Sequence, residues 1–361
     1  MEPESTSSPA PAQPDAAALR PTGMTAAELQ EACDFDRSFR AGQVYRWVAS
    51  GAPDFDAMTD LPSIERARLA SRFGSLYSSK VSTELNAEDG SLKLQLRLRD
   101  GAAVECVLLE DIEGRKTACL SSQVGCPMGC TFCRTGQLGF LRNLDPDEIM
   151  EQFHFLTARR GRISNVVFMG MGEPLRNLAA VRKAIALLSD PDGIGMSLRK
   201  ITISTCGIVP GILDLAENGP AVRLAVSLTV ADDDMRSELM PVNRTWNLAA
   251  LKSALVEYQR KTKDRITLEA VLTGNRNCSQ ADARALVRWV RPLRAQVNLI
   301  PWNRVPGMDF SEPDEAQIRA FTAVLEEAGL AAVRRMRRGR GVMGACGQLG
   351  DTLMADGAKQ D

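Results

Sequence analysis

The second half of this sequence alternates between short apolar runs and amphipathic stretches, and no other feature constrains the fold as strongly. Buried strands are predicted by the apolar runs at residues 165–174, 200–207, 222–230, 265–274 and 295–303. Between and after these runs, apolar residues recur at helical spacing, as in residues 247–262 and 314–329. Such alternation is typical of the α/β class, in which helices cover a parallel sheet. The count of about six units favours a partial (β/α)6-type barrel over a complete eight-unit barrel.

The chain before the barrel predicts three smaller parts. Residues 1–23 are rich in Pro, Ala and Ser, so we expect a disordered tail there. Residues 24–80 carry apolar residues at helical spacing, which predicts a helical module. Residues 81–112 alternate apolar and polar residues around the turn sequence RDG, which predicts a β-hairpin within a small β-rich adaptor. The barrel is then expected over residues 113–345, with a C-terminal tail over residues 346–361.

The composition indicates an ordinary globular protein. The formal net charge is -1, and of the 361 residues 44% are hydrophobic and 25% are charged. No apolar stretch approaches the ~18 residues that a membrane-spanning helix needs, and the N-terminus lacks the pattern of a secretion signal. We therefore expect a cytoplasmic protein without membrane contact. Because that compartment keeps thiols reduced, the nine cysteines are expected to be metal ligands, catalytic groups or buried apolar residues.

Three of the cysteines, Cys126, Cys130 and Cys133, lie within eight positions of each other. Zinc is the weaker interpretation, because zinc sites usually take four protein ligands and no second cysteine pair follows. The single histidine, His154, lies on an apolar-patterned stretch and is expected to be packed or on a helix surface. Three thiolates in one loop can instead hold three irons of a four-iron cluster, which leaves the fourth iron open to a small molecule. The spacing therefore predicts a [4Fe-4S] cluster.

Small polar residues and glycines follow the predicted strands. They are Gly172, Glu173, Ser204, Ser227 and Asn303. In folds of this class the reactive groups lie at the C-terminal ends of the strands. One such residue would be ordinary, since loops are polar, but the repetition from strand to strand predicts ligand contacts.

An arginine-rich stretch, "RRMRRGRG", occupies residues 334–341. Clusters of this kind commonly bind phosphate groups. The alternative is a solvated basic face at the end of a helix, and charge alone does not decide between the two.

Several longer motifs surround the cysteine triplet. They are "CLSSQVGCPMGCTFCRTGQLGFLRNL", "MGMGEPLRNL", "SELMPVNR", "NLIPWN" and "ACGQL", with "FRAGQVYRWV" and "MTDLP" nearer the N-terminus. The triplet is the signature of the radical S-adenosylmethionine superfamily, and the motifs in this order closely resemble the RlmN/Cfr family of RNA adenine methyltransferases. The resemblance runs from about Phe39 to about Leu349 and so covers most of the chain.

The resemblance implies a radical enzyme with two kinds of cofactor. One [4Fe-4S] cluster per chain would be bound by the triplet of Cys126, Cys130 and Cys133. Two molecules of S-adenosylmethionine would be used per turnover. Their contacts would be Gly172, Glu173, Ser204, Ser227, Leu228, Thr229 and Asn303.

The resemblance also implies three catalytic residues. Cys346 would accept a methyl group and carry it to carbon 2 of adenine as an S-methylcysteine intermediate. Cys119 would then attack Cys346 and leave a transient disulfide bond that releases the base. Glu105 would accept the proton from the ring carbon. The other cysteines, Cys33, Cys106, Cys206 and Cys278, match no family role and are interpreted as structural.

One position departs from the family pattern. The family usually carries Ser-Leu-His where this chain has Ser227, Leu228 and Thr229. Threonine is shorter than histidine and carries no charge near neutral pH. This departure leaves open a catalytically altered paralogue that binds RNA or S-adenosylmethionine. Methylation at carbon 8 of adenine, as in the Cfr type, also stays open, because both branches of the family share these motifs.

The partners also follow from the resemblance. The expected substrate is 23S ribosomal RNA, with transfer RNA as a further candidate, and residues 24–80 would be an RNA-binding accessory module. A flavodoxin or ferredoxin would supply electrons. We expect a monomer.

Overall fold

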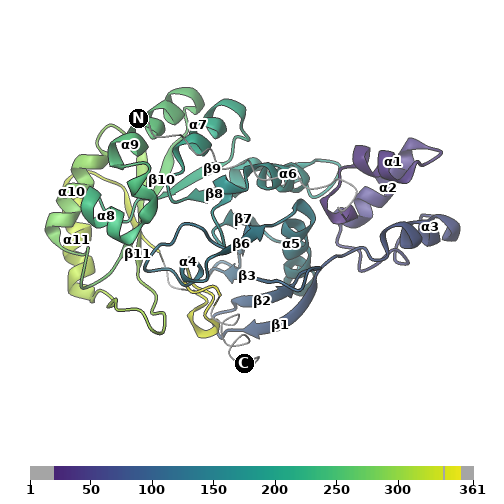
Figure 1. Ribbon diagram of the computed structural model, residues 1–361, viewed down its shortest axis with the longest axis horizontal. Coiled ribbons are helices and arrows are strands. Elements are labelled where there is room, and N and C mark those ends of the chain that lie inside the picture. Colours follow the sequence, from purple (N-terminus) through teal and green to yellow (C-terminus); the bar gives the residue numbers. More distant parts are fainter. Residues whose placement is uncertain (1–19, 336–337, 351–361) are drawn as a thin grey trace, which may run out of the picture.

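The computed structural model describes residues 20–335 and 338–350. Its central feature is a sheet of ten strands in the order β1-β2-β3-β4-β7-β8-β9-β10-β11-β12 (Figure 1). Neighbouring strands from β4 to β12 are parallel, whereas β1, β2 and β3 join the same sheet in antiparallel fashion. The partial barrel and the α/β class predicted from the alternation are thereby confirmed.

The parallel strands and the helices between them follow the predicted order. The strands are β4 (Lys116–Cys119), β7 (Asn165–Phe168), β8 (Ile201–Thr205), β9 (Arg223–Ser227), β10 (Ile266–Leu272), β11 (Ala295–Pro301) and β12 (Ala332–Arg334). The helices are α5 (Pro146–Arg160), α6 (Leu178–Ser189), α7 (Val209–Asn218), α8 (Asp233–Leu239), α9 (Leu248–Thr262), α10 (Gln280–Val290) and α11 (Glu315–Glu327). Strands β4 and β12 were not predicted, because each is too short to show a periodic pattern of its own.

Side-chain caps fix where the barrel helices begin. Asp145 and Glu148 form a capping box at the start of α5, and Asn247 accepts the N–H of Ala250 at the start of α9. Each cap satisfies a backbone N–H that the first helical turn leaves without a partner. The strand-to-helix loops therefore end at defined positions, which keeps the strand ends in register around the barrel.

The antiparallel strands extend the barrel sheet. They are β1 (Lys80–Asn86), β2 (Leu92–Arg97) and β3 (Ala103–Glu110), and β2 and β3 form the predicted hairpin. Because β3 also pairs with β4, this region continues the barrel sheet. Along β2 the leucines alternate with the buried polar residues Lys93 and Gln95, so one face of this hairpin is polar although it is buried.

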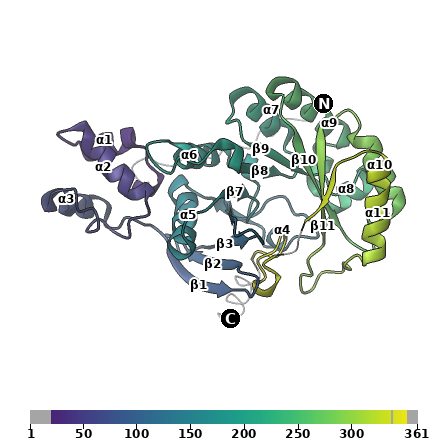
Figure 2. The ribbon, with the colours of Figure 1, turned by 180° about the vertical axis from the view of Figure 1, so that it is seen from behind.

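The N-terminal helices form a lobe at one end of the molecule. They are α1 (Ala26–Cys33), α2 (Ser38–Ala49) and α3 (Ser63–Phe73), and both ribbon views place them beside α5 and α6 (Figures 1 and 2). The predicted helical module is present in this region. Tyr45 of α2 donates a hydrogen bond of 2.9 Å to Asp190 at the end of α6.

Residues 20–23 are ordered, although the sequence predicted a disordered tail up to residue 23. Pro21–Gly23 form a 3-10 helix that is buried against α5, and a Cβ at Gly23 would lie only 2.7 Å from the backbone nitrogen of Asp147. Thr22 also donates a hydrogen bond of 3.2 Å to Glu151 of α5. Packing against the barrel therefore orders the end of a segment whose composition favours disorder. Residues 1–19, the rest of that predicted tail, lie outside the described residues.

The single histidine is packed, as one of its two interpretations expected. His154 of α5 is buried, and its ring contacts those of Tyr77 and Phe153 edge-on. Burial lowers the pKa of His154 to about 4, so the imidazole is neutral at neutral pH.

Within residues 20–335 and 338–350, no helix combines the length and the apolar character that crossing a membrane requires.

A small hairpin presents the start of the cysteine loop. It consists of β5 (Gln123–Gly125) and β6 (Phe140–Asn143), with the short helix α4 (Arg134–Gln137) between them. Gly125 has a φ of +74°, and a Cβ at this position would lie 2.0 Å from the carbonyl oxygen of Gly139. Only glycine fits there without moving the hairpin.

This close approach predicts a contrast between two glycines. Gly125→Ala should lower the free energy of unfolding by about 3 kcal/mol or more, because it adds a steric clash to an unfavourable φ. Gly139→Ala is the matched control: its φ is +75°, but a Cβ there meets nothing within 4 Å, so it should cost only about 1 kcal/mol. Urea unfolding of the cluster-free variants measures both values. Equal losses would contradict the close approach.

Candidate active site

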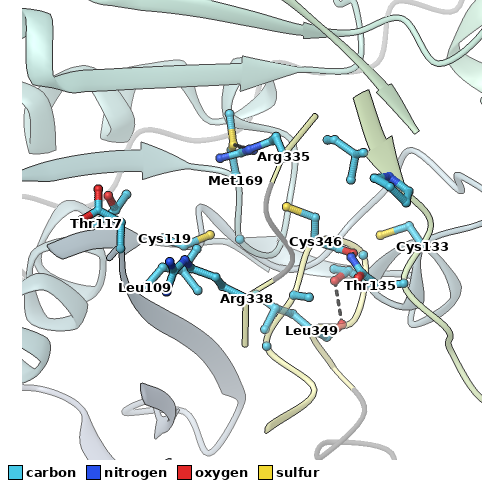
Figure 3. Close-up of a pocket in the computed structure, with 18 of the residues that line it drawn as sticks. Leu109, Thr117, Cys119, Cys133, Thr135, Met169, Arg335, Arg338, Cys346 and Leu349 are labelled. Atoms are coloured by element: carbon cyan, nitrogen blue, oxygen red, sulfur yellow. Dashed lines mark hydrogen bonds between the residues drawn. The ribbon is translucent and has the colours of Figure 1, made fainter. Parts of the chain in front are cut away.

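Two cavities lie at the C-terminal ends of the parallel strands. The cysteine-loop cavity, of about 170 Å³, is lined by Cys126, Cys130 and Cys133. The thiol-pair cavity, of about 230 Å³, is lined by Cys119 and Cys346 (Figure 3). Cys346 borders both cavities, as do Cys133, Asn303 and Arg335, so the two cavities adjoin and the Cys346 thiol lies where they meet.

Backbone contacts hold the cysteine loop in shape. The N–H of Cys126 donates to the carbonyl oxygen of Gly139 at 2.7 Å, and the N–H of Cys133 donates to that of Cys130 at 3.2 Å. Gly136 packs so closely that a Cβ there would lie 2.9 Å from the carbonyl oxygen of Cys130. The loop thus presents three partly buried thiols on a constrained backbone.

The chemistry of these three thiols fits a bound cluster. Burial raises the pKa of each thiol, to about 12 for Cys126, so thiolates are scarce at neutral pH without a cation. Coordination to a metal reverses this, because a ligating thiol is deprotonated. In the described part of the chain no three potential ligands surround a single metal-ion position. A cluster with one thiolate on each of three irons does not need such a position, and three thiols in one cavity suit it.

The strand-end residues contribute to the same cavity. It is lined by Gly172, Glu173, Ser204, Ser227 and Asn303 among others. A Cβ at Gly172, whose φ is +99°, would lie 2.5 Å from the Cβ of Gln123, so the chain requires glycine there. Burial raises the pKa of Glu173, while the N–H of Cys206, at 2.8 Å, works against that rise. Cys206, interpreted as structural from the sequence, therefore lines this cavity and orients Glu173.

Two polar atoms in the wall of this cavity are buried without a hydrogen-bond partner. They are Oε2 of Glu269 and Oδ1 of Asn303. Buried polar atoms in native proteins are nearly always paired with protein, water or ligand. The cavity wall therefore has acceptors ready for the donors of a polar ligand such as S-adenosylmethionine.

The departure from the family pattern lies beside this wall. Leu228 and Thr229 follow β9, and their N–H groups donate to the carbonyl oxygen of Glu269 at 3.0 and 3.1 Å. Neither is among the described residues that line the two cavities. Thr229 has a φ of +63°, unusual for a β-branched residue, and its buried hydroxyl has no partner.

The segment of residues 339–350, which we call the Cys346 segment, is fixed on two sides. The carbonyl oxygen of Cys346 accepts a hydrogen bond of 3.1 Å from the side-chain amide of Asn303. The carbonyl oxygen of Gly347 accepts one of 2.7 Å from the N–H of Arg134, and that of Leu349 accepts one of 2.8 Å from the hydroxyl of Thr135. Figure 3 shows the last of these bonds and the sulfur of Cys346 between Cys119 and Cys133. The strand end of β11 and the cysteine loop thus place the Cys346 thiol. Residues 351–361, the rest of the predicted C-terminal tail, lie outside the described residues.

Cys119 and Cys346 form a pair of free thiols in one cavity. Burial raises the pKa of Cys119 to about 12, and the charge of Arg335 opposes that rise. Burial also raises the pKa of Cys346, again opposed by Arg335. The structure holds no disulfide between these cysteines, so the disulfide implied by the resemblance is not present in this state.

Glu105 lies outside both cavities. Its side chain is fully buried, and its carboxylate is 3.4 Å from Nζ of Lys93, which is also buried. The N–H of Gly350 donates to the same carboxylate at 2.9 Å. Glu105 is therefore covered by the Cys346 segment and does not meet the other predicted catalytic residues in this conformation.

Two polar residues around the site, Lys93 and Glu269, were not predicted from the sequence. Arg335 and Arg338 were predicted only as members of the arginine-rich stretch, without a place in the site. The sequence did hold a signal for Lys93 and Glu269, because each is a charged residue inside an apolar run, "LKLQLRL" and "RITLEAVL". Charged side chains are rarely buried unless they are paired or functional.

Comparisons with known proteins agree with these features. Residues 120–284 match the radical SAM superfamily, and residues 23–73 match the ribosomal RNA large subunit methyltransferase N-terminal domain. The chain is 49% identical over 331 residues to a "probable dual-specificity RNA methyltransferase RlmN" of Treponema pallidum, covering 92% of this chain and 97% of the relative.

A second relative and a solved structure extend the comparison. The dual-specificity RNA methyltransferase RlmN of Syntrophotalea carbinolica is 42% identical over 324 residues, which cover 90% of this chain and 86% of the relative. The crystal structure of a radical SAM methyltransferase from Sphaerobacter thermophilus superposes with a TM-score of 0.89 at 39% identity, covering 92% of this chain and 99% of that one.

The two thiols of the pair should differ in reactivity. In cluster-free protein at pH 8, iodoacetamide should label Cys346 at least about tenfold faster than Cys119, because Cys346 is exposed to two cavities while Cys119 is 8% exposed. Both rates should rise with pH, since burial raises the pKa of both thiols above its ordinary value. Peptide mass spectrometry measures the labelling. Equal labelling of the two cysteines would contradict the arrangement.

Proposed function

The chain belongs to the RlmN family of the radical SAM superfamily, and on this premise we propose that it methylates carbon 2 of adenine in 23S ribosomal RNA, and also in transfer RNA. The single observation that carries the proposal is the position of Cys346. Its thiol borders both the cavity of the cysteine loop and the cavity of Cys119. A residue that receives a methyl group on one side and delivers it on the other needs such a position.

The cysteine-loop cavity is the proposed cofactor site. Cys126, Cys130 and Cys133 would hold three irons of a [4Fe-4S] cluster. The S-adenosylmethionine contacts would be Gly172, Glu173, Ser204, Ser227 and Asn303, with Leu228 and Thr229 behind them. When bound, the cluster and two molecules of S-adenosylmethionine supply a methyl group and the radical that removes one hydrogen atom from it. The cavity walls exclude water from this chemistry.

Cys346 is proposed as the methyl carrier. Carbon 2 of adenine is electrophilic and has no acidic proton, so direct transfer from a sulfonium is unfavourable there. A thiolate is nucleophilic, and Cys346 accepts the methyl group as a thioether. After loss of one hydrogen atom, the carbon held by the Cys346 sulfur forms the new bond to the base. The unpaired electron that this addition leaves on the base would be taken up by the oxidised cluster when the proton leaves carbon 2. Covalent catalysis thus divides one unfavourable step into feasible ones.

Cys119 is proposed to release the product. Its thiolate attacks the sulfur of Cys346, which breaks the sulfur–carbon bond and forms a disulfide. The electron pair of the broken bond stays with the transferred carbon, which takes up a proton and becomes the methyl group. The disulfide then needs two electrons from a reductant, for which flavodoxin or ferredoxin is suited, before the next turnover. The free thiols of the structure correspond to the reduced state.

Glu105 is proposed to accept the proton from carbon 2. In the described conformation the N–H of Gly350 and the ammonium of Lys93 occupy its carboxylate. Lys93 also lies 3.4 Å from the carbonyl oxygen of Met343 in the Cys346 segment. RNA binding must therefore shift this segment before Glu105 meets the base.

The remaining partners are proposed on the same premise. The lobe of α1–α3, within residues 24–80, is proposed as an accessory surface for RNA, and we propose a cytoplasmic monomer. Mass spectrometry of digested RNA after reaction separates the carbon 2 product from a carbon 8 product. Finding only 8-methyladenosine would replace the proposal with the Cfr-type alternative, and finding no methylated base with an intact cluster would favour the altered paralogue.

Removing the carrier thiol should abolish methylation without disturbing the cofactor site. Cys346→Ala should lower RNA methylation by a factor of at least about 10³, because the other described thiol that borders both cavities, Cys133, is a proposed cluster ligand and cannot replace the carrier. The visible absorbance of the cluster should be unchanged. Cys278→Ala, a buried cysteine outside both cavities, is the matched control and should retain activity. Normal product from Cys346→Ala would rule out the covalent route.

Removing the second thiol should trap an intermediate. Cys119→Ala should accumulate protein covalently joined to RNA through Cys346, because the attack that breaks the sulfur–carbon bond is lost. A denaturing gel resolves this species, and nuclease digestion followed by peptide mass spectrometry locates the attachment. If the variant turned over repeatedly without a covalent species, Cys119 would have no part in release.

A further inference from the structure

The arginine-rich stretch points its side chains in two directions. Arg334 pairs with Glu315 through two hydrogen bonds of 2.7 Å, and Arg340 pairs with Glu312, so these two arginines lie on the outer surface. Arg335 and Arg338 instead line the thiol-pair cavity. Successive residues of an extended strand face opposite sides, which explains the opposite directions of Arg334 and Arg335 at the end of β12.

Arg335 is held at the boundary of the two cavities. Its backbone N–H donates to the carbonyl oxygen of Leu299 at 2.9 Å, which fixes it at the end of β12. Its guanidinium lies 3.9 Å from Oε2 of Glu269 and 3.6 Å from the sulfur of Met169. A guanidinium has five N–H donors, so these two neighbours leave donors directed at the cavity.

Arg338 lies on another side of the same cavity. Its guanidinium donates to the carbonyl oxygen of Glu110 at the end of β3. Figure 3 shows Arg335 and Arg338 on opposite sides of the space into which the sulfurs of Cys119 and Cys346 point. Two cations of the described chain therefore flank the thiol pair.

The other walls of the thiol-pair cavity are mixed. Leu109, Met169, Ile300 and Leu349 form an apolar part, and Asp111 and Arg115 also line the cavity, where they pair with each other at 2.7 Å. The carboxylate of this cavity is thus paired with an arginine beside two further arginines, whereas the cysteine-loop cavity carries the carboxylates of Glu173 and Glu269. An apolar wall suits the face of a purine, and arginines suit phosphate, because a guanidinium binds phosphate oxygens through paired N–H groups. A phosphate would be repelled on the carboxylate side. The two cavities thus differ in the ligand that their charges favour.

The proposed function places the target adenosine in the thiol-pair cavity, with its base beside Cys346. On this basis we propose that Arg335 and Arg338 bind the phosphates that flank this nucleotide. Of the four described arginines in the stretch, two thus face inward and bind substrate, and two pair with acidic side chains outside. Extruding a base costs unstacking energy, and phosphate contacts at the cavity offset that cost.

The first test measures capture of RNA by the thiol. In a Cys119→Ala background, the yield of covalent RNA is followed against the concentration of a transfer RNA transcript. The double variant that carries Arg335→Gln and Arg338→Gln should raise the half-saturating RNA concentration at least about tenfold. The matched control, Arg334→Gln with Arg340→Gln, should stay within about twofold. Far-ultraviolet circular dichroism of every variant shows whether it is folded.

The second test needs neither cluster nor turnover. Binding of the same transfer RNA to cluster-free protein is measured over a range of salt concentrations. Each lost contact to a single-stranded phosphate makes the negative slope of log K against log salt shallower by about 0.7. Substituting both Arg335 and Arg338 should therefore make it shallower by about 1.4. The outward pair should leave the slope unchanged.

Two outcomes would overturn the assignment. Equal losses for the inward and outward pairs would show a diffuse basic surface, and an unchanged slope for the inward pair would show that neither arginine meets phosphate. Failure of the proposed function looks different: Cys346 would carry no methyl group, and no covalent RNA would form in the Cys119→Ala parent, while the salt slopes would still report on the arginines.

Discussion

The hydrogen bonds between the Cys346 segment and the barrel mouth are the constraint on which the site depends. Asn303 holds the carbonyl of Cys346, and Arg134 and Thr135 of the cysteine loop hold Gly347 and Leu349. These bonds join three parts of the chain that are far apart in sequence. Because they fix the backbone from Cys346 to Leu349, the thiol stays between the cofactor cavity and the cavity of Cys119. The site therefore consists of two adjoining cavities, and of the pair Cys119 and Cys346 it is Cys346 that borders both.

The same segment also limits access to the site. Gly344 packs so tightly that a Cβ there would lie 3.3 Å from a methyl group of Val107, and Gly350 and Met343 cover the buried pair of Lys93 and Glu105. Glu105 and Val107 lie on the same face of β3 that continues to Leu109 in the thiol-pair cavity. A modest displacement of the Cys346 segment would thus join Glu105 to that cavity. A buried carboxylate left without partners is costly, so Lys93 keeps Glu105 ready while the segment is closed.

Much of this arrangement was predictable from the sequence, for physical reasons. Periodicity predicted the barrel, since each strand from β7 to β11 is an apolar run followed by a helical stretch. The spacing of Cys126, Cys130 and Cys133 predicted a metal loop, because three thiols so close together have few other uses in a reducing compartment. Composition failed for Thr22 and Gly23, where packing on α5 outweighs a disorder-prone sequence. It also failed for Arg335 and Arg338, since charge density does not tell which way a strand directs each side chain. The covering of Glu105 depends on contacts across more than two hundred residues, which no local pattern reports.

The account rests on the methyl group passing through Cys346, and the isotope content of the product tests this most directly. Anaerobic reaction with S-adenosylmethionine that carries a fully deuterated methyl group is followed by digestion of the RNA and mass spectrometry of the modified adenosine. If the methyl on Cys346 loses one hydrogen atom before it bonds to the base and regains a proton from water on release, the product methyl carries two deuterium atoms. A product methyl that retains all three would show direct transfer and contradict the account.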